Sequence, residues 1–490
     1  MGSEPHQLHF ILFPFMAQGH MIPMLDIARL LANHGVIVTI VTTPLNAKRF
    51  KPTISRAIQS GLKIQFLELQ FPISQESRLP NDCENLDMLP SLSIGNEFFL
   101  ATNQFQESVE RLLQELKPNP KCIISDMCLP YTSQIASNLG IPRIAFNGFS
   151  CFCMMCMHCI YSSPKILENV KSEYEYFVLP GLPHRIELTK NQLPQSMHSN
   201  MGRFTEQIGV AEMVTYGIIV NSFEELEPTY VQEFKKARGN NKVWCIGPVS
   251  LYNKDKLDKV QRGDKASIDE QECLNWLDLQ KQDSVLYVCF GSLCNLVPLQ
   301  LIELGLGLEA SNRPFIWVIR RGETSKELEK WIEEDGFEER IKGRGLLIRG
   351  WAPQVAILSN PAIGGFLTHC GWNSTLEGIT AGKPMVTWPL FADQFCNERL
   401  VVDVLNIGVK VGAEFTLTWG EEDKVRVLVK REEVKRAIDR LMDGGEESEE
   451  RRKKAKELSI MAKKAMEENG SSYLNMKLLI EDIRQKINSE

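Results

Sequence analysis

Several features are missing from this sequence of 490 residues, and each absence narrows its function. No apolar segment reaches the roughly 18 residues that a helix needs to cross a bilayer. The polar opening, MGSEPHQLHF, leads directly into an apolar run and has no charged-then-apolar signal peptide. The formal net charge of −7 gives no reason to expect a nucleic acid or a membrane surface as partner. We therefore expect a cytoplasmic protein without a membrane span.

Three phosphate-binding signatures are also missing or misplaced. Lys383 follows Gly382 but lacks the earlier glycine of a Walker loop. Gly305, Gly307 and Ala310 resemble a dinucleotide fingerprint, yet they fall inside a helical pattern instead of following a strand. No Asp-x-Asp occurs in the chain. The sequence thus argues against a nicotinamide-dependent oxidoreductase and against a transferase that binds a diphosphate through a metal. We expect no metal and no cofactor.

The thirteen cysteines are interpreted as free, buried thiols in a reducing compartment, because no secretory signal precedes them. Five metal-ligating residues crowd into CFCMMCMHC, which spans residues 151–159. Structural zinc sites usually place ligand pairs on turns, whereas this spacing distributes the thiols around a helix among Phe and Met. We interpret the cluster as a soft apolar helix that lines the core or a ligand pocket, with metal binding as the less favoured alternative.

Strands and helices alternate along the chain, which predicts a doubly wound α/β fold. Residues 9–15, 36–42 and 122–125 are apolar runs typical of buried parallel strands. His20 comes after the first run, in a turn before a helix expected from residue 21, and Asp126 directly follows the third. In open parallel sheets, ligands bind at the carboxyl ends of the strands. These two residues are therefore candidate site residues.

Composition predicts the domain boundaries. Residues 1–249 form an N-terminal domain, and the charged stretch 250–268 is interpreted as an interdomain linker. Residues 269–470 form a second α/β domain, followed by an amphipathic helix at 471–487. Two long stretches rich in turn residues, near 70–90 and 163–199, are typical of binding loops or lids.

The stretch 351–394 carries the strongest functional pattern, WAPQVAILSNPAIGGFLTHCGWNSTLEGITAGKPMVTWPLFADQ. Its centre predicts a buried strand, a turn and a helix start, and such a helix start is an anion site. Trp351 at the front is suited to stacking on a base, while Asp393 and Gln394 at the end are suited to binding hydroxyls. Base, diphosphate and polyol in that order describe a nucleotide sugar.

A structural interpretation stands beside this one. Ser374 and Glu377 fit a capping box that finishes a helix end. Trp372 and Trp388 are suited to the core, and His369 to a buried turn. A single helix start is a weak signal by itself, so the residues alone leave both interpretations open.

The segment resembles, in residues and in length, the signature box of plant UDP-dependent glycosyltransferases of secondary metabolism. The resemblance implies the GT-B fold, two Rossmann-like α/β domains facing a cleft. It also implies that the closing Gln394 goes with glucose. By that resemblance the uracil meets Trp351 and Ala352, the ribose Gln354 and Glu377, the diphosphate Ser292, His369, Asn373 and Ser374, and the sugar Trp372, Asp393 and Gln394.

His20 is the candidate general base. A histidine can take the proton of an acceptor hydroxyl as the new bond forms, and a buried carboxylate would orient the ring. A lone histidine in such a turn is more often a plain polar residue, but the resemblance implies a catalytic His20 hydrogen-bonded to Asp126. It further implies acceptor contacts at His20, Phe149, Phe391 and Ala392.

The expected function is that of a monomeric inverting enzyme that moves glucose from UDP-glucose to a plant small molecule. Triterpenoids, flavonoids and other phenolics, and hormones are the acceptor classes that the resemblance favours. The alternative is a binding protein for UDP-sugars or apolar metabolites that performs no reaction.

Overall fold

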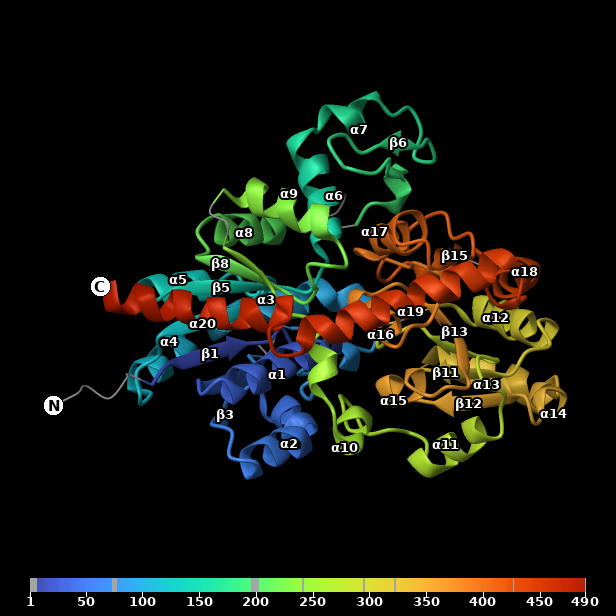
Figure 1. The fold of residues 1–490 in the computed structure, drawn as a ribbon, viewed down its shortest axis with the longest axis horizontal. Coiled ribbons are helices and arrows are strands. Elements are labelled where there is room, and N and C mark those ends of the chain that lie inside the picture. Colours follow the sequence, from blue (N-terminus) through green and yellow to red (C-terminus); the bar gives the residue numbers. More distant parts are fainter. Residues whose placement is uncertain are drawn as a thin grey trace. The chain divides into compact units, whose positions relative to one another are not determined.

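The computed structural model describes residues 7–72, 77–194, 202–239, 242–293, 296–320, 323–425 and 427–489 (Figure 1). The chain divides into two compact units. Unit 1 comprises Met1–Ser150, Ser199–Asp264 and Lys464–Glu490, and unit 2 comprises Cys151–His198 and Lys265–Lys463. None of the helices in the described part of the chain is long and apolar enough to cross a membrane.

Unit 1 is built on a parallel sheet with the strand order β3-β2-β1-β4-β5-β8-β9. Every residue of β1 and β4 is buried, as expected where helices cover both faces of a parallel sheet. The chain leaves β1 on one side to form β2 and β3, and on the other side to form β4, so the strand order reverses there. The strands are β1 (His9–Phe13), β2 (Ile37–Thr42), β3 (Ile64–Glu68), β4 (Cys122–Asp126), β5 (Arg143–Asn147), β8 (Gly217–Val220) and β9 (Val243–Cys245).

Helices flank this sheet, and α1, α2 and α20 share one apolar core with β1, β2 and β4. The last helix, α20, contacts β9 and is held there by an ion pair of 2.7 Å between Lys242 and Asp482. The helices of unit 1 are α1 (Gln18–Asn33), α2 (Pro44–Gln59), α3 (Gly95–Thr102), α4 (Gln106–Glu115), α5 (Thr132–Leu139), α8 (Gly202–Met213), α9 (Pro228–Arg238), α10 (Lys256–Val260) and α20 (Ser471–Ser489).

Part of the stretch predicted as an interdomain linker, 250–268, packs on unit 1. Its first part folds onto α1 and α2, and Lys256–Val260 forms helix α10. Asp258 is buried and pairs with both Arg29 and Arg56. Arg262 forms a 2.7 Å ion pair with the buried Asp26. The charges that suggested exposure are therefore partners for charges on two earlier helices, and unit 1 extends to Asp264.

Unit 2 contains a second parallel sheet, with the order β12-β11-β10-β13-β14-β15. Its order reverses between β10 and β13, as that of unit 1 does between β1 and β4. The strands are β10 (Val285–Cys289), β11 (Phe315–Ile319), β12 (Gly345–Arg349), β13 (Ile363–Thr368), β14 (Met385–Thr387) and β15 (Gly408–Lys410). A separate antiparallel pair joins β6 (Phe177–Val178) to β7 (Glu187–Leu188).

The helices of unit 2 are α6 (Cys151–Ser162), α7 (Lys165–Asn169), α11 (Glu270–Asp278), α12 (Pro298–Ala310), α13 (Glu323–Glu334), α14 (Phe337–Ile341), α15 (Gln354–Leu358), α16 (Trp372–Thr380), α17 (Gln394–Arg399), α18 (Arg431–Met442) and α19 (Glu446–Met466). Gly307 lies inside α12, where a Cβ would come within 2.7 Å of Val434. This glycine of the apparent fingerprint thus serves the packing of α12 against α18.

One expectation about local structure was wrong. Helix α1 begins at Gln18, so His20 lies in its first turn and not in the preceding turn. Helices α3 and α4 are separated by a 3-10 turn at Asn103–Phe105. The predicted domain boundary at residue 249 stays a prediction, although residues 151–198 group with unit 2 in the compact units.

Candidate active site

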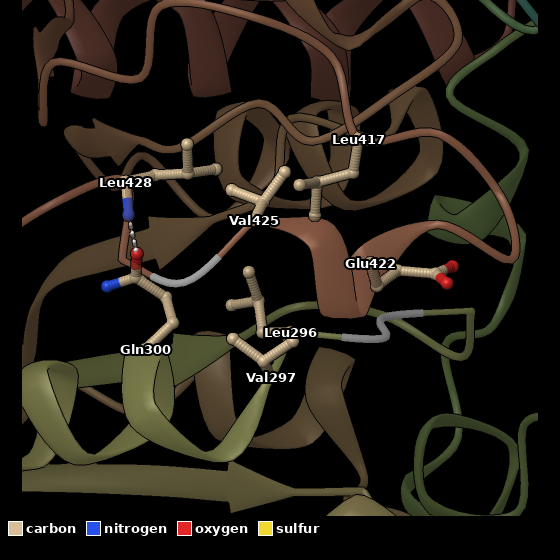
Figure 2. Close-up of a pocket in the computed structure, with 7 residues that line it drawn as sticks. All are labelled: Leu296, Val297, Gln300, Leu417, Glu422, Val425 and Leu428. Carbon is tan, nitrogen blue, oxygen red and sulfur yellow. Dashed lines mark hydrogen bonds between the residues drawn. The ribbon is translucent and has the colours of Figure 1, made fainter.

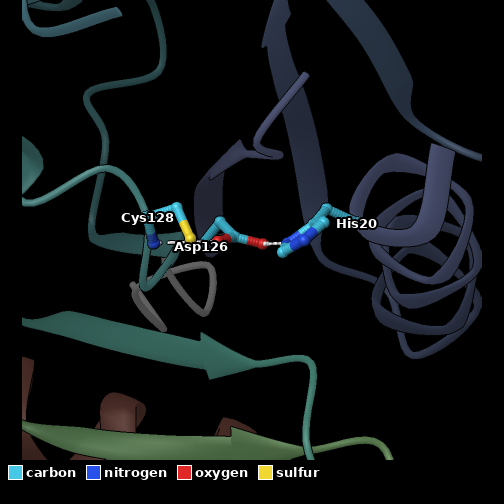
Figure 3. Close-up of side chains that lie close together, drawn as sticks. All are labelled: His20, Asp126 and Cys128. Atoms are coloured by element: carbon cyan, nitrogen blue, oxygen red, sulfur yellow. Dashed lines mark hydrogen bonds and ion pairs between the residues drawn. The ribbon is translucent and has the colours of Figure 1, made fainter. Parts of the chain in front are cut away.

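His20 and Asp126 are joined by a hydrogen bond of 2.7 Å between the imidazole Nδ1 and the carboxylate Oδ2 (Figure 3). The two residues are 106 positions apart in sequence. The sheet brings them together, because β1 and β4 are neighbours, Asp126 ends β4, and His20 lies in the first turn of the helix that follows β1. The contact implied by the family resemblance is therefore present, at the point where the strand order of unit 1 reverses.

The two partners differ in exposure. The Asp126 side chain is fully buried, whereas 28% of the His20 side chain is exposed. The other carboxylate oxygen of Asp126 accepts a 2.9 Å hydrogen bond from the backbone N–H of Cys128. The carboxylate is thus oriented from both sides, and the imidazole remains within reach of a ligand.

Cys128 completes the only group of three metal-ligating side chains found among the described residues. The ligand atoms of His20, Asp126 and Cys128 lie within 4.8 Å of one another. Figure 3 shows Asp126 between the other two, so the three form a row. Burial and the nearby Asp126 carboxylate raise the pKa of the Cys128 thiol well above its usual value. Nδ1 of His20 and both carboxylate oxygens of Asp126 are engaged in hydrogen bonds within the protein, so the row is interpreted as a hydrogen-bonded histidine–aspartate pair.

A cluster of buried aromatic rings lies beside His20, and no local pattern in the sequence indicates it. The ring of Phe15 meets the imidazole edge to face at a centroid distance of 5.3 Å. Phe15 stacks on Phe99 at 4.7 Å, and Phe99 contacts Phe204 at 5.1 Å. All three phenylalanines are buried, so they form a packed aromatic support for the His20 ring.

Unit 2 has a counterpart at its own reversal of strand order. Gly291 follows β10 and His369 follows β13, and these strands are neighbours. A Cβ on Gly291 would come within 2.7 Å of the His369 ring, and a Cβ on Gly371 within 2.4 Å. Only glycine fits on either side of this imidazole. Gly291 also has a positive φ of 74°, which side-chain-bearing residues rarely adopt.

The packing around His369 sets its charge. Burial lowers the pKa of the imidazole to about 4, although a hydrogen bond to the backbone of Cys289 works in the opposite direction. His369 is therefore neutral at physiological pH. It lies next to the start of α16, where Trp372, Asn373 and Ser374 carry the first N–H groups of the helix. Such N–H groups, which lack partners within the helix, favour an anion.

The capping-box interpretation of Ser374 and Glu377 was wrong. The N-cap of α16 is Gly371, so both residues lie inside the helix, one turn apart. Gln354 Nε2 donates to the Ser374 hydroxyl at 3.0 Å and to the Glu377 carboxylate at 2.8 Å. Gln354 and Glu377, predicted to bind the ribose, and Ser374, predicted to bind the diphosphate, thus form a single polar cluster.

Trp351, which precedes Gln354 by three residues, is held in place by hydrogen bonds of its backbone. Its N–H donates to the Ser267 hydroxyl at 2.9 Å, and its carbonyl accepts from the Ser267 N–H at 2.8 Å. The indole Nε1 is buried and has no hydrogen-bond partner in the described part of the chain. Ala352 beside it is buried, and Ser292 and Asn373 are half-buried.

Asp393 and Gln394, the last two residues of the stretch 351–394, lie at the start of helix α17. Asp393 accepts a 2.6 Å hydrogen bond from Asn397 Nδ2, which also donates to the carbonyl of Cys370 at 2.9 Å. Gln394 Oε1 accepts two backbone hydrogen bonds from the turn before it, of 2.7 and 3.1 Å. Cys370 and Ala392 have positive φ angles of 65° and 53°, and such strain is common at functional sites. Asn397 thus links the start of α17 to the loop after β13, a connection that the sequence did not indicate.

The remaining predicted positions have mixed surroundings. The side chains of Trp372 and Trp388 are buried, in agreement with the core interpretation. Phe149 is a half-buried residue of unit 1. Phe391 is a half-buried residue of unit 2, and it meets Trp419 edge to face at a centroid distance of 5.8 Å.

The cysteine-rich stretch forms helix α6, and its four cysteines are buried. Every cysteine in the described part of the chain is a free thiol. Cys153 lies within hydrogen-bond reach of Cys396 on α17, so this helix packs against the helix that begins with Gln394. The only three-ligand metal group found in the described ranges is the one at His20, which leaves the helix interpretation of this stretch in place.

A small cavity in unit 2 lies away from these residues. Leu296, Val297, Leu417 and Val425 line it, and Gln300 closes one side with a 2.6 Å hydrogen bond to the Leu428 N–H (Figure 2). It has room for about one water molecule and contains no predicted site residue.

Comparisons with known proteins agree with this geometry. Residues 263–441 match the family described as "UDP-glucoronosyl and UDP-glucosyl transferase", and residues 6–251 match "Glycosyltransferase, N-terminal domain". The chain is 58% identical over 480 residues to UDP-glycosyltransferase 73C3 of Arabidopsis thaliana, covering 98% of this chain and 96% of that one. It belongs to the plant family 1 UDP-glycosyltransferases.

Other members of this family extend the comparison. UDP-glycosyltransferase 73C25 of Barbarea vulgaris is 56% identical over 485 residues, covering 99% of this chain and 97% of that protein. Glycyrrhiza uralensis UGT73P12, solved with glycyrrhetinic acid 3-O-monoglucuronide, superimposes with a TM-score of 0.89 at 41% identity. That match covers 99% of this chain and 98% of the other. As in other plant UDP-glycosyltransferases, the two α/β units are those of the GT-B fold.

Proposed function

We propose that this UDP-glycosyltransferase moves glucose from UDP-glucose to a hydroxyl of a plant small molecule and gives a β-O-glucoside with inversion. The observation that carries the proposal is the hydrogen bond between His20 Nδ1 and Asp126. A binding protein has no need for an oriented, partly exposed imidazole, whereas deprotonation of a hydroxyl requires one.

In the proposed mechanism, Asp126 holds a proton on Nδ1 of His20 and thereby assigns Nε2 the role of proton acceptor. As the acceptor oxygen attacks the anomeric carbon, its proton passes to Nε2, and the bond from that carbon to the UDP oxygen breaks. The buried carboxylate stabilises the resulting imidazolium. Proton transfer of this kind contributes about 10²–10⁴-fold to the rate.

The leaving UDP gains negative charge, which the start of α16 is placed to stabilise. The N–H groups of Asn373 and Ser374 lie in the first turn of that helix. His369, being neutral, would act there as a hydrogen-bond donor instead of a cation. This arrangement supports departure of UDP without a metal, in keeping with the absence of Asp-x-Asp from the sequence.

The donor assignment follows the order of groups along the box. We assign uracil to Trp351 and Ala352, ribose to the Gln354–Glu377 cluster, and the hexose to Asp393 and Gln394. The buried, unpartnered indole N–H of Trp351 and the Gln354 bridge support this order. Glucose is preferred over other hexoses on the ground of the closing glutamine.

For the acceptor we propose an apolar polycyclic alcohol or phenol, such as a triterpenoid, a flavonoid or a hormone. The apolar surroundings of His20, where the buried rings of Phe15 and Phe99 pack beside the imidazole, are compatible with this class. Among the similar structures, Glycyrrhiza uralensis UGT73P12 holds a triterpenoid glucuronide, and Phytolacca americana UGT2 holds pterostilbene together with UDP-2fluoro-glucose. A cytoplasmic location and a monomeric state stay predictions.

The test is incubation with UDP-glucose and a panel of triterpenoids, flavonoids and hormones. We expect UDP release matched by a product that is heavier by one hexose, with the β configuration. Substitution His20→Ala should abolish transfer while calorimetry still shows UDP binding. Sugar-nucleotide binding without transfer by the unaltered protein would favour the binding-protein alternative, and transfer by the variant would remove His20 from the role of base.

A further inference from the structure

Helix α17 connects the sugar end of the donor box to a buried cation. The helix begins with Gln394 and ends with Arg399, whose side chain is only 7% exposed. Near its start, Asn397 fixes the helix to Asp393 and to the loop after β13. A displacement of α17 would therefore move the residues assigned to the hexose.

The guanidinium of Arg399 makes contacts in three directions. Its Nη1 donates to Asp403 at 3.4 Å, and its Nη2 donates to Gln192 Oε1 at 3.3 Å. The ring of Tyr176 lies beneath the guanidinium at 5.9 Å. The buried Nε has no hydrogen-bond partner in the described ranges. Two of these three contacts reach the segment 170–192, which belongs to the same unit.

That segment contains the β6–β7 pair and the 3-10 turn Lys190–Gln192. Gln192 is buried, and its Oε1 also accepts the N–H of Thr189 at 3.3 Å. The carbonyl of Asn191 accepts the N–H of Thr416 at 2.8 Å. The segment lies within the second long stretch, 163–199, that its length and composition mark as a binding loop. Arg399 and the Thr416 N–H are thus two points at which this loop is fixed to unit 2.

We propose that Arg399 is a positioning residue that holds the acceptor-side segment 170–192 against the helix carrying the sugar contacts. The Arg399 side chain would then hold in place both the segment assigned to the acceptor and the helix assigned to the hexose. The inference rests on the proposed function, because it assigns the segment to the acceptor and α17 to the sugar. A planar guanidinium can bond in several directions at once, which a lysine cannot do from the same position.

The test compares Arg399→Met with Arg185→Met as a matched control. Methionine keeps much of the apolar part of the arginine side chain and removes the guanidinium group. Arg185 lies on the same segment, but its ion pair with Glu187 is exposed and contributes little. Three quantities are measured on both variants: the KM for the acceptor, the ratio of kcat/KM for UDP-glucose over UDP-galactose, and the rate of limited chymotrypsin cleavage near Tyr174 and Tyr176.

For Arg399→Met we expect the acceptor KM to rise about tenfold, because a buried hydrogen-bonded anchor is lost. The sugar ratio should fall and cleavage should accelerate, while the Kd for UDP stays within about twofold, since the uracil, ribose and diphosphate residues lie elsewhere. Arg185→Met should match the unaltered protein in all three. Unchanged acceptor KM and cleavage in Arg399→Met would overturn the inference, as would an equal effect of Arg185→Met.

A second variant guards against a folding defect. Gln192→Leu removes the partner on the segment and leaves Arg399 with Asp403. It should reproduce the faster cleavage and the higher KM, and the double variant should be no worse than Arg399→Met alone. Fully additive effects would overturn the inference. Cleavage and UDP binding need no turnover, so they report on Arg399 even if the proposed glucosyl transfer fails.

Discussion

Each α/β unit has a histidine beside its own reversal of strand order, and the two rings lie in opposite environments. In unit 1, His20 follows a central strand, is partly exposed, and is hydrogen-bonded to a buried carboxylate. In unit 2, His369 follows a central strand, is enclosed by two glycines, and has its pKa lowered to about 4. The first environment leaves the ring hydrogen-bonded to a carboxylate and partly exposed, and the second keeps the ring neutral. Topology supplies the position, and the packing around each ring determines its chemistry.

The largest effect is expected from removing the carboxylate in unit 1. Substitution Asp126→Asn keeps the shape but removes the charge that stabilises an imidazolium, so kcat should fall by about 10²–10⁴-fold. Stopped assays of UDP release measure kcat, and calorimetry should show an unchanged Kd for UDP. A kcat within about threefold of the original would mean that His20 does not depend on Asp126, and the contrast between the two histidines would be lost.

The next effect concerns the glycine beside the second histidine. In Gly291→Ala, the new methyl group would lie 2.7 Å from the His369 ring. We expect the Kd for UDP to rise at least about tenfold, because the ring must move from its place at the start of α16. Gly35→Ala is the matched control, since Gly35 also has a positive φ but no atom within 4 Å of the added Cβ. That control should lose about 1–2 kcal/mol of stability through backbone strain and bind UDP normally.

A smaller effect should appear in the pH dependence of stability. An unfolded histidine takes up its proton near pH 6.5, whereas folded His369 does so only near pH 4. Between these values the unfolded state binds more protons, so this group's contribution is fully present above about pH 6.5 and is lost as the pH falls toward 4. His369→Gln should therefore lose less stability than the original protein between pH 7 and pH 5 in urea titrations. Equal losses would show that the ring is not held neutral.

The smallest effect is expected at the third residue of the row in unit 1. In Cys128→Ser the backbone N–H that orients Asp126 remains. We therefore expect kcat to stay within about twofold, since a hydroxyl can replace the thiol near the carboxylate. A loss of more than tenfold, together with a change in kcat on addition of a chelator, would revive the metal interpretation of this group.

Much of the donor half could be predicted, because the box is continuous in sequence and its strand–turn–helix pattern is local. Where the helix starts could not be derived in the same way. The spacing of Ser374 and Glu377 fits a capping box, but the helix already begins at Trp372. A capping pattern gives only the spacing between two residues. Gly371, which packs against His369, determines the residue at which the helix starts.

Contacts between distant segments were the hardest to predict. The pairing of His20 with Asp126 depends on strand order, which composition and periodicity leave open. The charged stretch after residue 250 was interpreted as a linker from its composition, and its ion-pair partners, among them Asp26 and Arg29, could not be foreseen because they lie on a much earlier helix. Phe15, Asn397 and Arg399 carry no local signal, because each acts through a neighbour that is distant in sequence or lies around a turn.

The hydrogen bonds of Gln394 constrain what this residue can offer. Its carbonyl oxygen is engaged by the backbone N–H groups of Leu390 and Phe391. The amide therefore cannot flip without breaking both, and its NH₂ group is the end that can turn toward a ligand. A hydroxyl that meets this side chain must do so through a lone pair. A residue that presents an acceptor instead would invert that requirement and would also remove the two hydrogen bonds that hold the preceding turn.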